Sequence, residues 1–538
     1  MIVLNITVSK VNYTFFLKDF LAIRTEFLIL VCDLAIVSFF AIMIDFIIYL
    51  LFRRSKFIIG LLKSVFILSG ISMFAADLFT LYYYNMSFND IMFETITNTN
   101  ARECVEFIQA YIVNPKLWLF FAVIIIIAYL LHRFISRRKI LSTFIIISLF
   151  IMGIFASSRE IFTGRGTPRL INSVSLSRIV IFVLHHYEGI KELQKMTQEA
   201  PRIELTKNNS VIPYVIFVLG ESTTRNHMSI YNYNIQTNPK LSGRKLYIFD
   251  DTISPTPSTA RSMERIFTFC NNESFSDWFK YADIFSILKE AGYYTVWLSN
   301  QESASFGTSV FGFYPNKCDY SEFIESLKED MYRGSAYDES LLPVLDNALN
   351  LHHNKNFYVI HLMGTHFHYQ KRYPENFSVF SLHDEDKGTE SQKEIRARYD
   401  NAVLYNDYIV DEIIRRFEDK NAIVIYISDH GEEVYDEADF FGHLESVTRS
   451  MAEIPFIIWV SQKFSQAYPK LEQRIASSTH RPYMTDDMIH TLLDIMSIET
   501  SEYDPSRSII SASFDQTRPR IFYSKYIYDR DTGLHALQ

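Results

Sequence analysis

Four long apolar runs in the first third of the chain constrain its fold more than any other feature of the sequence. Each approaches the roughly 20 residues that an α-helix needs to cross a bilayer. The runs cover residues 26–52, 57–82, 117–131 and 140–156. The third and fourth carry no internal charge, which is unusual for a helix of a soluble core. We expect a membrane bundle of four helices within residues 1–157, with a fifth crossing as the alternative.

The basic residues in the loops between these runs predict an orientation. The segments "RRSK" (53–56) and "HRFISRRK" (132–139) are strongly basic, whereas the loop 83–116 carries only Arg102 and Lys116 as basic residues. Lysine and arginine are enriched in short cytoplasmic loops. The two basic segments are therefore expected in the cytoplasm, and the chain beyond residue 157 outside it.

After a linker at 158–210, the pattern changes to short apolar runs separated by helix-like stretches. The runs are 214–220, 294–299, 357–363, 422–428 and 455–460, and the helix-like stretches include 276–292 and 396–419. Continuous apolar strands that alternate with helices are typical of a mainly parallel sheet covered on both faces. Residues 211–538 are therefore predicted to form an extracytoplasmic α/β domain in which helices sandwich the sheet.

Charge and cysteine content narrow the possible partners. The net charge is −9 and the pI about 6.0, so no basic surface argues for a nucleic-acid partner. The four cysteines fit neither a zinc ribbon nor a disulfide-rich scaffold. Cys270 and Cys318 could pair in an exported domain, but two free thiols are the preferred interpretation.

Polar side chains follow the predicted strands at once. Glu221 follows the first strand, and Asp429 and His430 follow the fourth. Nearby loops contribute further histidines, namely His366, His368 and His443. Ligands bind beyond the carboxyl ends of parallel strands, and this mixture of nitrogen and oxygen donors suits Zn²⁺ or, less well, Mn²⁺. We expect one metal centre there.

The stretch "PTPSTARSM" (255–263) offers three hydroxyl groups, on Thr256, Ser258 and Thr259. A hydroxyl group at an open metal position loses its proton more readily and becomes a nucleophile. Pro255 and Pro257 bias Thr256 toward an extended conformation. The residues after Thr259 contain neither Gly nor Pro and indicate a helix, whose N-terminus favours an anion. Thr259 is therefore the preferred nucleophile.

At these residues the chain resembles the lipid-linked phosphoethanolamine transferases, membrane enzymes of the alkaline phosphatase and sulfatase superfamily. The similar stretches occur in family order and cover most of the chain after residue 210. They are 215–241, 254–263, 291–302, 361–374, 399–414, 426–434 and 452–459. The motifs "SDHGEEV" and "FFGH" are most similar to the branch that includes enzymes modifying the lipopolysaccharide core.

The resemblance implies an alkaline phosphatase-like fold and a specific set of site residues. The zinc ligands map onto Glu221, Thr259, Asp429 and His430. Thr259 maps onto the nucleophile, and His366 and His443 onto catalytic histidines that bind the donor phosphate. Asn300, in the stretch "SNQE" after the second predicted strand, is expected to bind substrate. One zinc ion is implied, with a second as an alternative.

Two departures from the family pattern stand out. Many relatives follow the nucleophile with a Pro-Cys pair and carry several disulfides, whereas this chain continues "SMERIF" and has two cysteines in the domain. Relatives usually have five membrane helices, and hydropathy here supports four. The first departure implies a domain held together by its core rather than by crosslinks.

The function implied is transfer of phosphoethanolamine from phosphatidylethanolamine to a cell-envelope acceptor, with lipopolysaccharide core or lipid A preferred, through a phosphoethanolamine adduct of Thr259. The protein would be a multi-pass protein of a bacterial inner membrane with its catalytic domain in the periplasm. Alternatives are a phosphodiesterase or phosphatase of this fold, a glycerol-phosphate transferase, and an inactive membrane sensor. A sulfatase is disfavoured because "TPSTAR" lacks the Cys/Ser-x-Pro-x-Arg motif.

Overall fold

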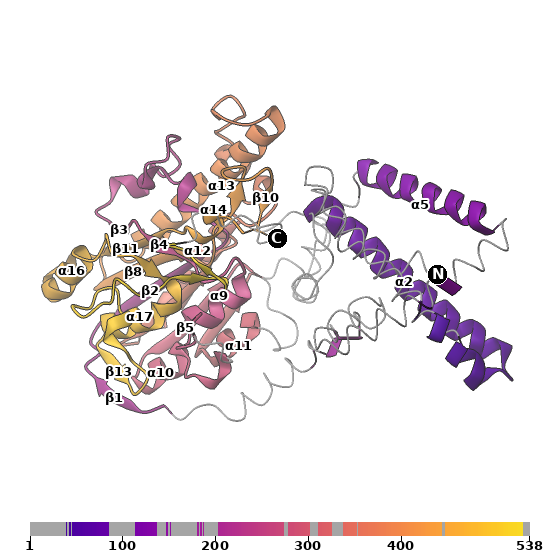
Figure 1. The fold of residues 1–538 in the computed structure, drawn as a ribbon. Helices are drawn as coiled ribbons and strands as arrows, with labels where there is room; N and C mark the ends of the chain where they lie inside the picture. The colour runs from indigo at the N-terminus through magenta and orange to yellow at the C-terminus, as the bar shows by residue number, and fades with distance from the viewer. Residues whose placement is uncertain are drawn as a thin grey trace. The chain divides into compact units, whose positions relative to one another are not determined.

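The computed structural model describes residues 42–84 apart from 45, 115–136, a few isolated positions before 190, and 203–530 outside gaps at 274–277, 302–309, 325–336, 352 and 444–446. The chain divides into two compact units, Met1–Lys191 and Glu192–Gln538. The second unit contains the sheet and the helices that the pattern after residue 210 predicts (Figure 1).

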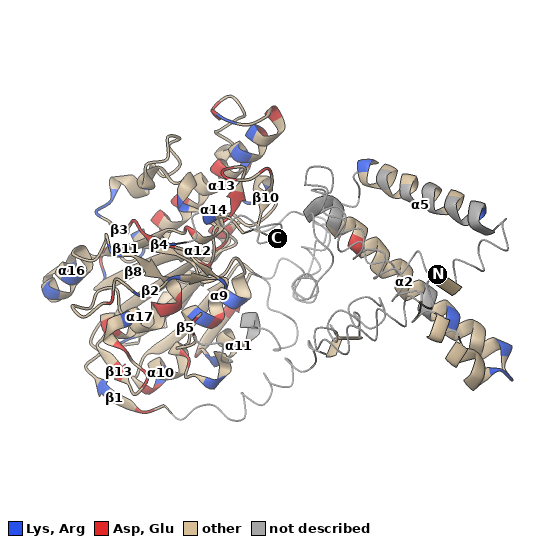
Figure 2. Cartoon of the chain, viewed as in Figure 1, with Lys and Arg blue, Asp and Glu red and all other residues tan. Residues whose placement is uncertain are grey.

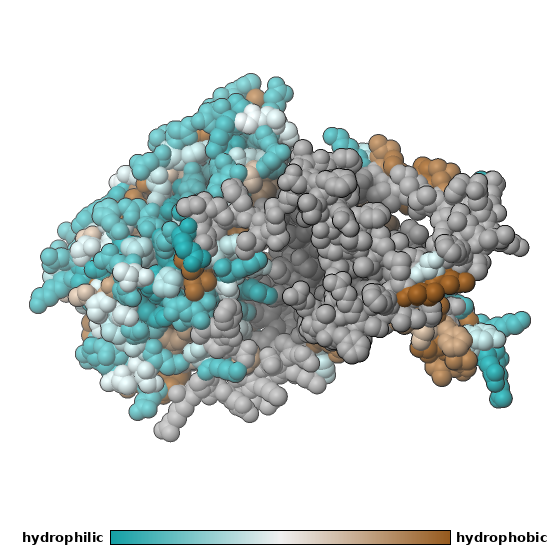
Figure 3. Space-filling view, viewed as in Figure 1, coloured by the Kyte–Doolittle hydropathy of each residue, from teal (hydrophilic) through white to brown (hydrophobic). Residues whose placement is uncertain are grey.

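The first unit is helical where it is described. Helix α2 spans Lys56–Tyr84 and α5 spans Pro115–Ser136. Within the described part of the chain, Lys56–Thr80 is the one helix whose length and hydropathy suit a membrane crossing, and a shorter apolar helix covers Ile42–Phe52. Figure 2 shows basic residues at the two ends of α5, and Figure 3 shows apolar side chains along these helices. Such a distribution suits helices surrounded by lipid.

Helices α2 and α5 coincide with the second and third predicted crossings, and the helix at Ile42–Phe52 overlaps the first. The fourth predicted crossing, 140–156, lies almost wholly outside the described residues, as does most of the linker 158–210. The number of crossings therefore stays a prediction.

A seven-stranded sheet forms the centre of the second unit, in the order β3-β11-β8-β2-β7-β5-β6. In that order the strands cover Tyr247–Phe249, Phe456–Val460, Ala422–Ser428, Tyr214–Gly220, Asn356–His361, Tyr294–Ser299 and Tyr320–Phe323. All five predicted strands are present, and the short strands β3 and β6 form the two edges.

The sheet is mainly parallel, as expected. Strands β8, β2, β7, β5 and β6 run in one direction, whereas β11 is antiparallel to both β8 and β3. Gly220 pairs with Ser428, and Leu219 pairs with both Ile427 and His361. Strands β2, β7 and β8 therefore end at the same level, and the residues that follow them emerge side by side.

Helices cover both faces of this sheet. The helices of this unit are α9 (Thr259–Ile266), α10 (Ile284–Glu290), α11 (Val310–Lys317), α12 (Leu341–Leu349), α13 (Glu390–Arg415), α14 (Arg449–Ala452), α15 (Gln462–Ala467), α16 (Pro469–Ala476) and α17 (Met488–Met496). Phe217 and Leu219 of β2 pack into the layer that contains α9, α10 and α17. Ile216 and Val218 pack into the layer that contains α12 and α13. This alternation confirms the predicted sandwich.

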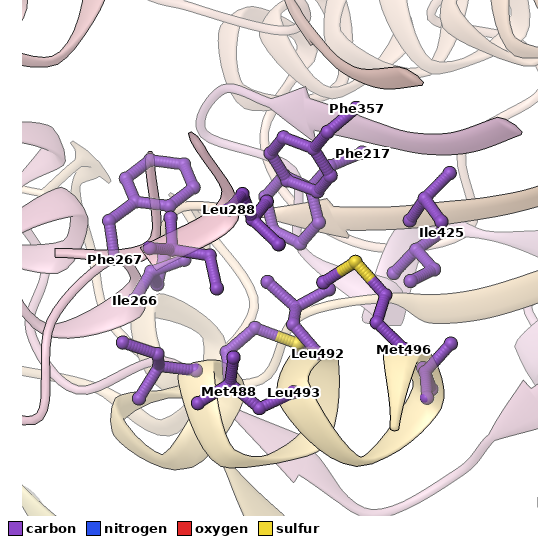
Figure 4. Packing of buried hydrophobic residues seen from close by; sticks show 14 of the residues in the cluster. Phe217, Ile266, Phe267, Leu288, Phe357, Ile425, Met488, Leu492, Leu493 and Met496 are labelled. Atoms are coloured by element: carbon purple, nitrogen blue, oxygen red, sulfur yellow. The ribbon is translucent and has the colours of Figure 1, made fainter. Parts of the chain in front are cut away.

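Helix α17 shows how one of these layers is held together. Met488, Leu492 and Met496 of this helix are buried among side chains that include Phe217 of β2 and Phe267, just after α9 (Figure 4). Burying one such side chain contributes roughly 1.5–3 kcal/mol relative to its exposed state. The apolar layer thereby fixes α9 against the sheet, and α9 carries the predicted nucleophile at its first residue.

Short strand pairs complete the unit. They are β1 (Leu205–Asn208) with β13 (Ile498–Thr500), β4 (Thr252–Ile253) with β12 (Tyr483–Met484), β9 (Glu433–Val434) with β10 (Phe441–Gly442), and β14 (Ile521–Phe522) with β15 (Tyr526–Ile527). Cys270 is buried and Cys318 is partly buried, and no disulfide joins them, as the preferred interpretation expects.

Candidate metal centre and nucleophile

Three predicted ligands meet at the carboxyl ends of β2 and β8. Glu221 follows Gly220, the last residue of β2, and Asp429 and His430 follow Ser428, the last residue of β8. His430 Nε2 lies 3.3 Å from Glu221 Oε1 and 3.4 Å from Asp429 Oδ2. All three side chains are buried, and their ligand atoms lie within 4.8 Å of one another. One ion could therefore contact all of them.

Asp429 is oriented through one of its two oxygens. Its Oδ1 accepts the backbone N–H of Ser222 at 3.0 Å and that of His430 at 2.7 Å. Its Oδ2 is buried and accepts no hydrogen bond from the described residues, with His430 Nε2 at 3.4 Å. Leaving a buried carboxylate oxygen without a partner is costly, and a bound cation would supply the missing partner. The site therefore fits the zinc ion that the sequence predicts.

His430 is held with one ring nitrogen available for a metal. Its Nδ1 lies 2.8 Å from the carbonyl oxygen of Gly431, to which it donates, so that Nε2 faces the carboxylates. A hydrogen bond from the second nitrogen commonly orients a metal-binding histidine.

The electrostatics of the site favour a cation. Burial, followed by the charge of Glu221, raises the pKa of Asp429 to about 7. Burial alone would lower the pKa of His430, but Asp429 and Glu221 raise it to about 10. Burial would raise the pKa of Glu221, but the hydrogen bond and charge of His430 hold it well below its usual value. A divalent ion would replace the imidazole proton in this role.

Thr259 is the first residue of α9 and reaches the same place. Its Oγ1 lies 3.1 Å from both carboxylate oxygens of Glu221 and 3.4 Å from His430 Nε2. The helix begins at Thr259 because the backbone of the preceding residue, Ser258, is still extended. Met263, one turn further along the helix, is buried. The predicted position of Thr259 at a helix N-terminus is confirmed.

The two rival hydroxyl groups have other partners or positions. Thr256 Oγ1 donates to the carbonyl oxygen of Ser258 at 3.1 Å and lies 3.1 Å from Ser262 Oγ. Ser258 precedes the helix and makes no capping hydrogen bond with its side chain. Among the contacts of the described residues, Thr259 alone of the three reaches Glu221 and His430.

A second group of possible ligands shares His430. His443 Nδ1 lies 2.7 Å from Glu432 Oε2, and Tyr369 donates its hydroxyl to Glu432 Oε1 at 2.7 Å. The rings of His430 and His443 are 4.4 Å apart. Glu432 is fully buried, whereas the side chain of His443 is 19% exposed. His443 is therefore the more accessible member of this pair.

The remaining predicted residues differ in their surroundings. Burial has the largest effect on the pKa of His366 and lowers it to about 4, while the charges of Glu221 and His443 have smaller effects. His368 adopts a left-handed conformation before the short helix η9 (Tyr369–Lys371). Asn300 donates its side-chain amide to Asp338 Oδ1 at 2.8 Å, so its role in substrate binding stays a prediction.

Two residues of the site were missed by the sequence reasoning. Gln301 donates to Glu221 Oε2 at 2.9 Å and to the carbonyl oxygen of Leu362 at 3.1 Å. Glu432 orients His443. Each is a near neighbour of a predicted residue, Asn300 and His430 respectively. The position of Gln301 just after β5 is a signal that could have indicated its role, since β5 lies beside β7 in the sheet.

Comparison with known proteins places the second unit in a family. A family model described as Sulfatase matches residues 213–498. The chain belongs to the sulfatase family. The matched range contains every predicted ligand and Thr259, and the predicted alkaline phosphatase/sulfatase-like fold is thereby confirmed.

Individual relatives confirm the resemblance to phosphoethanolamine transferases. Phosphoethanolamine transferase EptC of Escherichia coli (strain K12) is 26% identical over 495 residues, which cover 85% of this chain and 84% of EptC. The crystal structure of the C-terminal periplasmic domain of EptC from Escherichia coli, a complex with zinc, is 28% identical, with a TM-score of 0.56, and covers 62% of this chain and 94% of that domain.

A third relative extends the similarity in fold to the whole chain. The integral membrane protein lipooligosaccharide phosphoethanolamine transferase A (EptA) from Neisseria meningitidis has a TM-score of 0.65 at 20% identity. The match covers 94% of this chain and 97% of EptA. This match shows a shared fold over nearly the whole length of both chains.

Proposed function

We propose that this protein transfers phosphoethanolamine from phosphatidylethanolamine to a cell-envelope acceptor, preferably the lipopolysaccharide core or lipid A. EptC, a relative over most of the chain, is named a phosphoethanolamine transferase. The observation that carries the proposal is the position of Thr259, whose hydroxyl group lies 3.1 Å from both oxygens of Glu221 and 3.4 Å from His430. A hydroxyl group among metal ligands is suited to forming a covalent intermediate.

The metal of this site is proposed to be zinc. Glu221, Asp429 and His430, together with Thr259, would hold it, and the unpartnered Oδ2 of Asp429 supports this assignment. When bound, the ion would lower the pKa of a hydroxyl group and draw charge from a phosphoryl oxygen. The crystal structure of the EptC domain is likewise a complex with zinc.

In the first half of the reaction, Thr259 Oγ1 attacks the phosphorus atom of the donor lipid. The hydroxyl proton is lost to solvent, the Oγ1–P bond forms and the P–O bond to the glycerol breaks. His443 supplies the proton that the departing glycerol oxygen takes up, and Glu432, 2.7 Å away, stabilises the charged imidazole beforehand. Diacylglycerol leaves, and phosphoethanolamine remains on Thr259.

In the second half, an acceptor hydroxyl group attacks the same phosphorus atom. His443 takes the acceptor proton, the new O–P bond forms, and the Oγ1–P bond breaks. Thr259 Oγ1 regains a proton from solvent. His366 is uncharged at neutral pH because burial lowers its pKa to about 4, so it is suited to donating a single neutral hydrogen bond to a phosphoryl oxygen in both halves.

The position of Thr259 at the N-terminus of α9 adds to this chemistry. The first backbone N–H groups of a helix have no partner within the helix, and they favour an anion at its end. The effect is typically about 0.3–1 kcal/mol, so ligation to the metal would provide the larger part of the activation. Apolar packing of Met263 and Ile266 keeps α9 in place during the reaction.

The catalytic unit is proposed to lie in the periplasm, anchored in a bacterial inner membrane by four crossings. The basic segments at 53–56 and 132–139 would then face the cytoplasm, with both termini outside it. A reporter fused after residue 55 should behave as cytoplasmic, and one fused after Gln538 as exported. A cytoplasmic N-terminus together with an exported Gln538 would instead support a fifth crossing within residues 1–25.

The adduct on Thr259 provides the direct test of the proposal. The purified full-length protein, incubated with phosphatidylethanolamine and no acceptor, should gain the mass of phosphoethanolamine on the peptide that contains Thr259. Thr259→Ala should abolish the adduct and the transfer. Ser258→Ala, a hydroxyl removed from the neighbouring residue, should keep both. An adduct on Ser258, or one that persists in Thr259→Ala, would contradict the assignment.

The competing functions give different outcomes in related assays. A phosphodiesterase would release free phosphoethanolamine with water as acceptor, and a glycerol-phosphate transferase would form its adduct from phosphatidylglycerol. An inactive sensor would form no adduct. Mass spectrometry of lipopolysaccharide from cells with and without the protein would identify the acceptor, since core and lipid A fragments separate after mild acid hydrolysis.

A further inference from the structure

Ser222, the residue between Glu221 and the rest of its loop, has a backbone conformation that serine rarely adopts. Its φ is +56°, in the left-handed region, where the Cβ atom of a non-glycine residue crowds the backbone. Such a conformation persists only where the surroundings hold it, and it is concentrated at functional sites. Ser222 is also fully buried, so the protein itself must provide the contacts that hold it.

This unusual turn fixes both carboxylates of the metal centre. The backbone N–H of Ser222 donates to Asp429 Oδ1 at 3.0 Å, and its hydroxyl donates to Glu221 Oε1 at 2.9 Å. Glu221 precedes Ser222 directly, so the φ angle of Ser222 also sets the path of the chain next to that ligand. A relaxation of Ser222 to negative φ would move its N–H away from Asp429 and separate the two carboxylates.

Two side chains hold the turn from outside. The carbonyl oxygen of Ser222 accepts the hydroxyl of Tyr399 and the hydroxyl of Thr365, each at 2.8 Å. The Tyr399 oxygen in turn accepts the backbone N–H of Thr224 at 2.9 Å. Tyr399 thus bridges the carbonyl of Ser222 and the N–H of the residue two positions later, and closes the loop that begins at Glu221.

Tyr399 is well placed to be a rigid support. It lies on the long helix α13 and is fully buried, with its ring against those of His227 and Tyr369 at 5.1 Å and 4.9 Å. Burial raises the pKa of its hydroxyl well above the usual value, so it remains a hydrogen-bond donor. No described contact joins its hydroxyl to Glu221 or Asp429 directly.

We propose that Tyr399 is a positioning residue of the metal centre, whose hydroxyl holds Ser222 in the left-handed conformation and thereby keeps Glu221 and Asp429 at the separation that one zinc ion requires. This inference rests on the proposed function, because that proposal assigns zinc to these ligands. Residues that orient metal ligands typically contribute 10- to 100-fold to metal affinity. Tyr399 should therefore affect zinc affinity without touching zinc or substrate.

Tyr399→Phe tests the proposal because it removes the hydroxyl and keeps the ring. Zinc affinity would be measured on the full-length protein in detergent, stripped of metal and titrated in competition with a chromophoric chelator. We expect at least a 10-fold weaker zinc affinity for Tyr399→Phe. The matched control is Tyr405→Phe on the same helix, where the lost hydroxyl accepts the N–H of Glu339 at 3.3 Å and makes no contact with the loop of Glu221 in the described part of the chain. This control should bind zinc as tightly as the wild type.

A second background separates positioning from a general loss of packing. Glycine adopts positive φ without the cost that a side chain imposes, so Ser222→Gly removes the need for a clamp. The effect of Tyr399→Phe on zinc affinity should be several-fold smaller in the Ser222→Gly background than in the wild type. If Tyr399→Phe alone does not fold, the pair Ser222→Gly and Ser222→Gly/Tyr399→Phe provides the comparison, and these two should bind zinc within a few-fold of each other.

The outcomes distinguish this inference from the proposed function. A wild-type protein that binds no zinc would overturn both. A wild type that binds zinc, with equal affinity in Tyr399→Phe, would overturn the role of Tyr399 and leave the metal centre in place. An equal loss of affinity in the Ser222 and Ser222→Gly backgrounds would also overturn it, since the hydroxyl would then act by a route other than the φ angle of Ser222.

Discussion

The two groups of side chains that share His430 differ in how they are enclosed. The side chains of Glu221, Asp429 and His430 are almost completely buried. The ends of β2 and β8 and the turn at Ser222 hold them in place. His443, in the second group, is 19% exposed and is oriented by Glu432. The first group, here called the closed group, holds the proposed zinc ligands away from solvent, whereas the second, the open group, leaves its proposed substrate-binding histidine accessible. Metal retention and turnover should therefore separate on mutation.

The largest effect is expected from a ligand of the closed group. Asp429→Ala should reduce both the zinc content and the transfer activity to below detection. The substitution deletes a carboxylate whose buried Oδ2 accepts no hydrogen bond from the described residues and is proposed to bind the ion. Zinc content by plasma mass spectrometry and transfer by lipid analysis would measure the two. His443→Ala, from the open group, should keep zinc while losing activity. An Asp429→Ala protein with full zinc would remove the distinction between the groups.

A smaller effect is expected from the support of the open group. Glu432→Gln keeps the size of the side chain but removes the charge that faces His443 Nδ1 at 2.7 Å. Transfer should fall roughly 10- to 100-fold, as is typical when an orienting partner of a functional histidine is lost. Zinc content should stay unchanged. Loss of zinc from this variant would mean that Glu432 belongs to the closed group.

The loop that leads to His443 should make the protein's stability depend on pH. Asp436, in that loop, lies 3.1 Å from His227, which also pairs with Asp400. Burial alone would lower the pKa of His227, but Asp436 and Asp400 raise it to about 9 from 6.5. The protonated form is therefore favoured by folding.

The contribution of His227 should be complete below pH 6.5 and should be lost as the pH rises through 9. Its size is at most about 3–4 kcal/mol. Melting temperatures of the wild type and of His227→Gln, recorded across this range, should converge as the pH rises. A difference that stays constant from pH 6 to 10 would show that His227 does not titrate in this way.

A further stability effect is expected where the chain passes close to Glu221. A Cβ atom on Gly364 would lie 2.8 Å from the carbonyl oxygen of Glu221, and the φ of Gly364 is +52°. Gly364→Ala should therefore destabilise the protein by about 1–3 kcal/mol and weaken zinc binding. Gly243→Ala is the control, because a Cβ atom there meets nothing within 4 Å. A melting temperature for Gly364→Ala equal to that of the control would contradict the close approach.

Much of this centre could be predicted because its residues follow apolar strands directly. Glu221 and Asp429 come just after uninterrupted runs of buried residues. Their position at the ends of strands could therefore be predicted without knowing which strands pair. The direction of β11 could not be predicted in this way, since a run of five buried apolar residues looks the same whether the strand runs parallel or antiparallel.

The details within each loop were harder to predict than the strands. Asn300 and Gln301 follow β5 as neighbours, and only the turn of the chain decides that Gln301 reaches Glu221 while Asn300 reaches Asp338. The left-handed turn at Ser222 left no signal either, because glycine or asparagine usually marks that conformation. Such features depend on contacts with distant residues such as Tyr399.

The pairing of Gly220 with Ser428 has a consequence for when the ion can be captured. The turn at Ser222 and the carboxylate of Asp429 are 207 residues apart in the chain, unlike the closely spaced ligands of a zinc finger. Glu221 and Asp429 come together only when β2 and β8 pair, so this site forms late in folding and the ion would enter a sheet that has already formed. Zinc would then stabilise the domain by mass action, by about 2.7 kcal/mol at a free concentration 100 times its dissociation constant. The persistence of the enzyme would thus follow the zinc supply of its compartment.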